Sequence, residues 1–174
     1  TFNHTIRKIT PARVVTTFAG TAGVYGAADG TGSAARFNTP TDITVNSAGT
    51  LLYAADYGNN EIRKITANRV VSTFAGSFNN PPGGVGYVEG IGRAARFEEP
   101  TGIAVAGTAV YVTDANNTIR KITSTGVVTT LAAIGPAWLS PDTIISWLGP
   151  WALVGVAAII FAECGLLIGF FLPG

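Results

Sequence analysis

One short phrase occurs three times in this chain of 174 residues, and its spacing constrains the fold more than any other feature. The sequence Ile-Arg-Lys-Ile-Thr stands at residues 6–10, 62–66 and 119–123, so successive copies begin 56 and 57 positions apart. A constant period of this length is typical of repeat architectures, in which each copy is one supersecondary unit. The sequence therefore predicts a repeat protein up to about residue 132.

Other segments recur around this phrase in the same order. β-branched runs bounded by Gly are typical of strands, and the N-terminal segment supplies only the last two strands of a unit. Four short strands at this period are typical of a propeller blade, so we predict a mainly β fold with about two and a half four-stranded blades. The strands are expected at 42–46, 51–56, 61–66 and 70–74 in one complete unit, and at 102–106, 110–114, 118–123 and 127–131 in the next.

These repeats resemble the NHL family of β-propellers in four motifs. They are Pro-Thr-Gly-Ile-Ala-Val at 100–105, Tyr-Val-Thr-Asp at 111–114, Asn-Asn-Thr-Ile-Arg-Lys-Ile at 116–122 and Asp-Gly-Thr-Gly-Ser-Ala-Ala-Arg-Phe at 29–37. The resemblance implies a scaffold that binds proteins, peptides, glycans or RNA, and it implies no reaction by itself. Propellers close with typically about four to eight blades. We therefore expect missing blades or protein partners to pack on the open sheet faces.

The character of the sequence changes after about residue 132. All eleven Lys and Arg lie at or before Lys121, and only Asp142 and Glu163 are charged beyond it. Residues 147–172 exceed the roughly 20 apolar residues that a helix needs to cross a bilayer. The predicted organisation is therefore propeller blades over 1–132, a linker with a short interfacial helix over 133–146, and one C-terminal transmembrane α-helix over 147–174.

The tail resembles the beginning of a DedA-family membrane protein. The resemblance rests on Trp-Leu-Ser-Pro at 138–141 and on the segment from Glu163 to Gly174, and the family is associated with lipid-carrier translocation. An ionisable group inside an apolar span is costly and is a functional hypothesis by default. In a DedA-like setting Glu163 would face a lipid or proton pathway, whereas in a lone anchor it would be protonated, snorkelling or paired with a partner subunit.

Two aspartates, Asp56 and Asp114, end equivalent predicted strands just before Asn-containing turns. They are candidates for a ring of carboxylates that binds a cation or a basic ligand. The alternative, which we favour, is a structural turn in which each carboxylate accepts N–H groups of the turn that follows it. A residue that is repeated in every blade is what a structural role predicts.

The basic pairs of the repeated phrase, Arg63-Lys64 and Arg120-Lys121, form a modest basic stripe. It could be a surface for an anionic partner, but solvated strand edges that discourage aggregation are favoured. Apolar residues flank each pair at i and i+3, which indicates either a β-bulge or a strand that is packed on both faces.

Glycine-rich loops precede two of the units, at 29–37 and 89–97. They lack the Gly-Lys-Ser/Thr ending of a phosphate-binding loop, so we expect blade-to-blade turns whose Phe37 and Phe97 plug the space between blades. The chain has one His, His4, and one Cys, Cys164. They cannot supply a zinc site or a catalytic triad between them, so we expect neither a cofactor nor an enzyme.

These features combine into a functional hypothesis. Residues 1–132 carry a formal charge of +3, too weak and scattered for a nucleic-acid binder. The leading hypothesis is a non-catalytic NHL-type interaction module, held in the lipid bilayer by a single span as an accessory or scaffold component of a membrane assembly, with the propeller outside the cytoplasm. The alternatives are a fragment of a DedA-type transporter that carries an NHL module, and a propeller-type lyase whose catalytic blades are missing.

Overall fold

The structure is a computed structural model that describes residues 2–78 and 86–133. These residues belong to one compact unit, Thr1–Ala133. The predicted linker beyond residue 133, the transmembrane helix over 147–174 and Glu163 lie outside the described residues. Within the two described ranges, no helix has the length and apolar character needed to cross a membrane.

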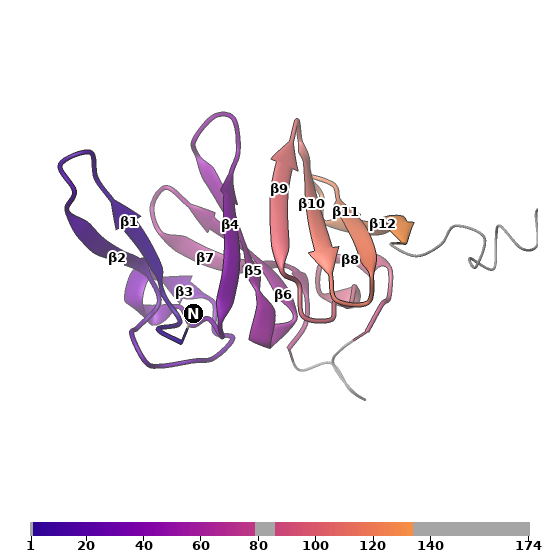
Figure 1. The fold of residues 1–174 in the computed structure, drawn as a ribbon, viewed down its shortest axis with the longest axis horizontal. Coiled ribbons are helices and arrows are strands. Elements are labelled where there is room, and N and C mark those ends of the chain that lie inside the picture. The colour runs from indigo at the N-terminus through magenta and orange to yellow at the C-terminus, as the bar shows by residue number, and fades with distance from the viewer. Residues whose placement is uncertain (1, 79–85, 134–174) are drawn as a thin grey trace, which may run out of the picture. The chain divides into compact units, whose positions relative to one another are not determined.

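The predicted strands form three antiparallel sheets, arranged one after another along the chain (Figure 1). The first is a pair, and each of the other two contains an up-and-down run of four consecutive strands. This arrangement confirms a mainly β chain built from partial propeller-like sheets. The strands are β1 (Ile6–Ile9) and β2 (Val15–Ala19); β4 (Pro40–Val45), β5 (Leu51–Asp56), β6 (Glu61–Thr66) and β7 (Val70–Gly76); and β9 (Gly102–Ala106), β10 (Ala109–Asp114), β11 (Thr118–Ile122) and β12 (Val127–Ala133).

Each large sheet has a fifth strand that the sequence pattern did not predict. The glycine-rich loops contribute β3 (Gly30–Thr31) to the outer edge of β7, and β8 (Gly90–Ile91) to the outer edge of β12. One 3-10 turn follows each, η1 (Gly32–Ala34) and η3 (Gly92–Ala94), and a third, η2 (Tyr57–Asn59), joins β5 to β6. Two-residue strands are too short to show a period, and their effect is to tie the loop before a blade to the last strand of that blade.

A β-bulge lies in the partner strand opposite the repeated phrase in all three copies. The register shifts between Ile62 and Arg63, and it shifts at the same place in β1 and β11. Ile62 faces Ala75 while Arg63 faces Thr73, so Phe74 is the extra residue of the partner strand. The strand is also packed on both faces, because Ile62, Arg63 and Ile65 are all fully buried. The two predicted alternatives, a β-bulge and a strand packed on both faces, therefore occur together at this phrase.

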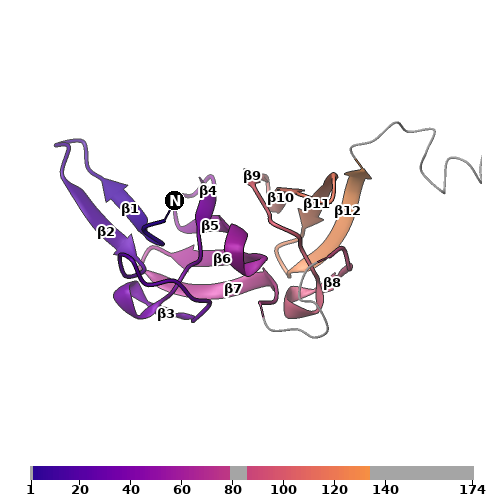
Figure 2. The same ribbon diagram turned by 60° about the horizontal axis from the view of Figure 1, so that its bottom comes forward.

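The hydrophobic core lies between neighbouring sheets (Figure 2). Phe97 is fully buried in a cluster that joins Ile62 of one large sheet to Ile122 of the next. Phe37 occupies the equivalent place between the β1–β2 pair and the sheet of β3 to β7. The prediction that these two phenylalanines plug the space between blades is confirmed.

Hydrogen bonds between neighbouring sheets also recur at equivalent positions of the repeat. Asn60 and His4 occupy equivalent left-handed positions, with φ of 55° and 53°. The Asn60 Oδ1 accepts the N–H of Glu99 at 2.8 Å, and the His4 Nδ1 accepts the N–H of Thr39 at 3.0 Å. His4 is therefore a blade-to-blade hydrogen-bond acceptor, where Asn serves in the next copy.

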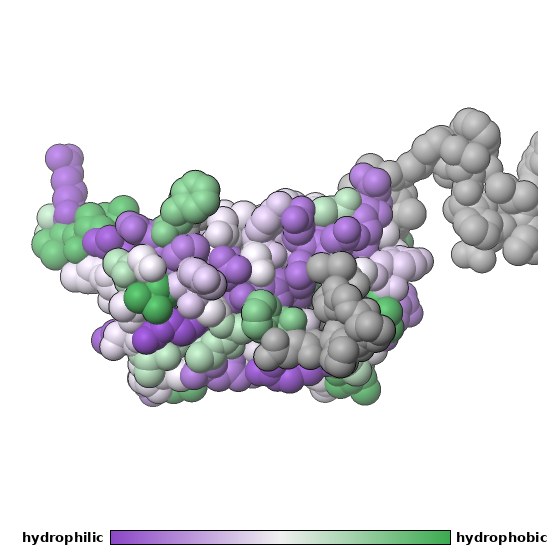
Figure 3. All heavy atoms as spheres, turned by 90° about the horizontal axis from the view of Figure 1, so that it is seen from below, coloured by the Kyte–Doolittle hydropathy of each residue, from purple (hydrophilic) through white to green (hydrophobic). Residues whose placement is uncertain are grey.

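The outer faces of the first and last sheets carry exposed apolar side chains. Ile9, Val14 and Val15 belong to the β1–β2 hairpin, and hydrophobic residues gather at that end of the molecule in Figure 3. Leu131 of β12 occupies the place that Phe74 has in β7 and is 58 % exposed. These faces are the ones on which the sequence predicts further blades or partners.

Candidate functional site

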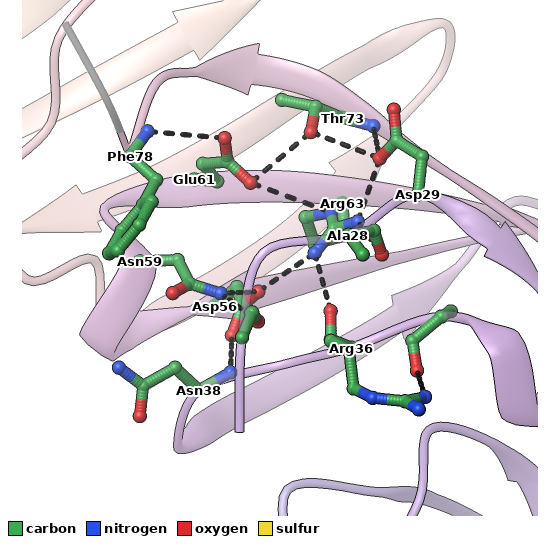
Figure 4. Close-up of polar contacts among 12 residues, drawn as sticks. Ala28, Asp29, Arg36, Asn38, Asp56, Asn59, Glu61, Arg63, Thr73 and Phe78 are labelled. Carbon is green, nitrogen blue, oxygen red and sulfur yellow. Dashed lines mark hydrogen bonds and ion pairs between the residues drawn. The ribbon is translucent and has the colours of Figure 1, made fainter. Parts of the chain in front are cut away.

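The most highly charged cluster of the described residues surrounds the buried guanidinium of Arg63 (Figure 4). Arg63 lies on the face of β6 that packs against the loop preceding the blade. Its Nη2 lies 2.7 Å from Asp29 Oδ1, and its Nη1 lies 3.1 Å from Asp56 Oδ2. The carbonyl oxygens of Ala28 and Arg36 accept further hydrogen bonds from it. Arg63 thus ties a loop to the end of the blade.

Arg120 repeats this arrangement in the next sheet. Its Nη1 lies 3.4 Å from Asp114 Oδ2, and it donates to the carbonyl oxygens of Val88 and Arg96. Both guanidinium groups also lie over a buried phenylalanine, at 5.3 Å for Arg63 on Phe37. The prediction of solvated basic strand edges is wrong for both arginines, because the loop that precedes each blade covers them and they are fully buried.

The other cations of the repeated phrase differ from these arginines. Lys64 and Lys121 are half-buried, and the Lys64 Nζ lies 5.7 Å from the centre of the Phe74 ring. Arg7 is exposed, and no described loop covers it. The structure therefore does not assemble the predicted basic residues into one stripe.

Asp56 and Asp114 have structural partners, although not those expected. Asp56 accepts the backbone N–H of Asn38, 18 residues earlier, and the side-chain amide of Asn59, both at 2.7 Å. Asp114 accepts the N–H of Glu98 at 2.7 Å. The expected turn that follows each aspartate does not supply the backbone N–H groups, because the carboxylates point back to the incoming loop.

Burial dominates the protonation of these two carboxylates. It raises the pKa of Asp56 from 3.8 to about 6, against the opposing effects of the Asn38 N–H, Asn59 and Arg63. Burial likewise raises the pKa of Asp114 to about 6, against the Glu98 N–H and Arg120. Desolvation disfavours the charged form more than these partners favour it.

The sequence did not identify three charged residues of the cluster, namely Glu61, Arg93 and Asp29, as site residues. Glu61 is fully buried, and its Oε1 accepts the N–H of Phe78 at 3.2 Å. Arg93 bridges Glu61 Oε1 at 3.4 Å and Asp29 Oδ2 at 3.0 Å. The available signal was departure from the repeat: Glu61 stands where other copies have Thr5 and Thr118, and Arg93 stands where the preceding loop has Ser33.

An open pocket of about 310 Å³ adjoins this cluster. It is lined by Ala27, Ala28, Glu61, Ser77, Phe78 and Arg93. A buried carboxylate, a half-exposed guanidinium and an exposed aromatic ring thus face one space. In the same described part of the chain, no three His, Cys, Asp or Glu side chains lie close enough together to hold a metal ion.

The fold and the buried charge clusters define the described residues as consecutive blades of a β-propeller-like protein. Neither a protein-family model nor a curated protein sequence matches the chain. Among solved structures it is similar to an auxiliary nutrient binding protein from Bacteroides thetaiotaomicron VPI-5482, at 26 % identity and a TM-score of 0.58 over 75 % of this chain and 34 % of that one. An auxiliary nutrient binding protein from Bacteroides ovatus ATCC 8483 gives 25 % identity and a TM-score of 0.59, over 75 % and 33 %.

A third similarity is to the catalytically inactive virginiamycin B lyase from Staphylococcus aureus with Quinupristin. It has 20 % identity and a TM-score of 0.49, over 78 % of this chain and 36 % of the lyase, and at that level it carries no argument about this chain. The chain spans about a third of the length of the nutrient binding proteins that it matches. The two nutrient binding proteins agree with the propeller expectation at the level of fold.

Proposed function

We propose that this chain is a non-catalytic binding module of NHL type that serves as an accessory or scaffold component of a membrane assembly. The observation that carries the proposal is the use of its recurring charges. Arg63 with Asp56, and Arg120 with Asp114, are buried and hold loops to blade ends. These shared charges are therefore structural, whereas Glu61 and Arg93, which depart from the repeat, line an open pocket.

A binding role also suits the relatives in fold. Two structures to which the chain is similar are named auxiliary nutrient binding proteins. A propeller presents loops at the ends of its blades on a rigid scaffold, which is where binding residues gather on many folds. The pocket beside Glu61 lies at such a blade end, between the loop before the blade and the loop after it.

Membrane attachment rests on the sequence beyond the described residues. The apolar run over 147–174 contains Glu163 as its one ionisable side chain, and its length matches a single span. In this proposal the bilayer is one partner of the chain, and the propeller lies outside the cytoplasm. Further blades or partner proteins cover the exposed faces of β2 and β12.

The experiment uses the full chain from washed membranes. The chain is expected to stay in the membrane fraction after alkaline carbonate treatment. After detergent extraction it is screened against amino acids, amines, sugars and nucleotides by thermal shift. A ligand that raises the unfolding temperature is expected to be recovered chemically unchanged after long incubation, as mass spectrometry would show.

Two results would contradict the proposal. Release of the chain by carbonate would contradict membrane attachment. Protein-dependent conversion of a ligand would contradict the proposal that the chain is non-catalytic. A boiled sample and the Glu61→Gln variant serve as controls for conversion.

A further inference from the structure

The pocket beside Glu61 is built from residues that depart from the repeat. Glu61 replaces a threonine, Arg93 replaces a serine, and Phe78 stands where the earlier copy has Ala22. In a repeat protein the shared residues maintain the stacking of the units. Three departures that meet in one cavity therefore indicate a site rather than another structural contact. The inference below deepens the proposed binding function and rests on it.

Small residues open one side of this pocket. Ala27 and Ala28 are equivalent to Tyr87 and Val88, because Arg63 donates to the Ala28 carbonyl as Arg120 does to the Val88 carbonyl. In the later copy the Tyr87 ring lies 5.5 Å from the Arg120 guanidinium. Ala27 carries only a methyl group at that position. The space that the Tyr87 ring fills beside the later blade is therefore left open beside the earlier blade, where it forms part of the pocket.

The charges around the pocket are not balanced. Three carboxylates, those of Asp29, Asp56 and Glu61, meet two guanidinium groups, those of Arg63 and Arg93, which leaves a formal charge of −1. Burial raises the pKa of Glu61 despite both arginines. One further cation beside Glu61 would stabilise its ionised form.

Exposure shows which of these groups a ligand can reach. The Glu61 side chain is fully buried, and its Oε1 contacts Arg93, whose side chain lines the pocket and is 55 % exposed. Asp29 is 41 % exposed and shares the same arginine. A ligand therefore reaches Glu61 by displacing the exposed Arg93 side chain, which keeps Asp29 as its partner. Phe78 offers an apolar ring with 48 % of its surface exposed.

We propose that this pocket binds a small organic amine whose ammonium group pairs with Glu61 and whose aromatic stem fills the space left by Ala27. The stem contacts the Phe78 ring and the methyl groups of Ala27 and Ala28. The hydroxyl of Ser77 supplies a second acceptor for the ammonium group. Three of the lining residues are apolar and three are polar, so the pocket offers surfaces for both ends of such a ligand.

The test measures the binding of four probes to the full chain in detergent by isothermal titration. Benzylamine is expected to bind. Benzyl alcohol, which lacks the charge, phenylacetate, which reverses it, and Nα-acetyl-lysine amide, which lacks the aromatic stem, are each expected to bind at least about tenfold more weakly.

Variants locate the site. Ala27→Tyr restores the ring of the later repeat and is expected to weaken benzylamine binding by about tenfold or more. Ala48→Tyr makes the same change on the exposed turn between β4 and β5 and should leave binding as in the wild type. Glu61→Gln preserves shape, removes the charge and should abolish the preference for benzylamine over benzyl alcohol. It also carries the test if Ala27→Tyr fails to fold.

Three results would overturn the inference: equal binding of benzylamine and benzyl alcohol, tighter binding of the lysine amide, or unchanged binding in a folded Ala27→Tyr protein. The proposed function fails differently. If a ligand from the broad screen binds Ala27→Tyr as tightly as the wild type, while benzylamine shows no preference for the wild type, the binding role stands and only the site beside Glu61 is contradicted.

Discussion

The buried arginines show how one side chain changes role with its surroundings. Arg7, Arg63 and Arg120 occupy the same place in the repeated phrase, yet only the last two are buried. A buried guanidinium must be paired, because an isolated buried charge is very costly. Asp56 and Asp114 provide that pairing, and backbone carbonyl oxygens of the covering loops accept further hydrogen bonds.

Asp114 should make the stability of the protein depend on pH. Its pKa is raised in the folded state to about 6, so its contribution to stability is fully present below about pH 4. That contribution is lost as the pH rises through about 6. We expect the free energy of unfolding of the wild type, relative to Asp114→Asn, to fall by up to about 3 kcal/mol over this window.

Urea unfolding of both proteins at several pH values measures this difference. Asp56→Asn should behave in the same way, because burial raises the pKa of Asp56 to the same value. A difference that grows with rising pH would mean that the ion pair to Arg120 outweighs the cost of burial.

Among the elements, the glycine that ends β7 is where backbone conformation matters most. Gly76 has a φ of +88°, and a Cβ on it would collide with the carbonyl oxygen of Asn60. Gly20, directly after β2, is similar: its φ is +89°, and a Cβ on it would collide with the carbonyl oxygen of His4. The strand end thus approaches the neighbouring turn more closely than any side chain would allow, which lets β7 pair with β6 up to Glu61.

Gly76→Ala should therefore cost more stability than a positive φ alone explains. Gly49 has a φ of +69° and open space around it, so Gly49→Ala isolates the backbone penalty of about 1–2 kcal/mol. The collision should add about 1–3 kcal/mol in Gly76→Ala. Chemical denaturation compares the two variants, and equal losses would show that the turn at Asn60 yields without cost.

At the scale of the whole molecule, the described sheets depend on one another through the phenylalanines between them. Phe97 contacts both large sheets, and Phe37 joins the first strand pair to the sheet that follows. Repeat proteins gain stability from such neighbour interfaces as much as from each unit. Within the described residues, the sheet of β8 to β12 has a packed neighbour on one face only.

Phe97→Ala should uncouple the two large sheets. The cavity is expected to cost about 3–5 kcal/mol, with the larger loss in β10 and β11, because the sheet of β3 to β7 keeps its contacts through Phe37. Hydrogen exchange of the strand amides reports each sheet separately. Phe2→Ala, at a side chain that is 88 % exposed, is the control and should stay within about 0.5 kcal/mol. Equal loss of protection in both sheets would contradict this view.

Much of the fold could be predicted from the sequence because it is local and repeated. The period of 56 to 57 residues, the β-branched runs and the bounding glycines determine strands, turns and blade order, and two phenylalanines at equivalent loop positions identify the plugs. The same repetition indicated that Asp56 and Asp114 are structural. These properties depend on neighbours along the chain, whose spacing a sequence displays directly.

The tertiary structure alone decided which charges are buried and which side chains meet. The burial of Arg63 depends on a loop that precedes it by 27 to 35 residues. The pocket joins Ala27, Glu61 and Arg93, which three different segments bring together. Contacts between distant segments follow from the stacking of blades, and no period along the chain records that geometry.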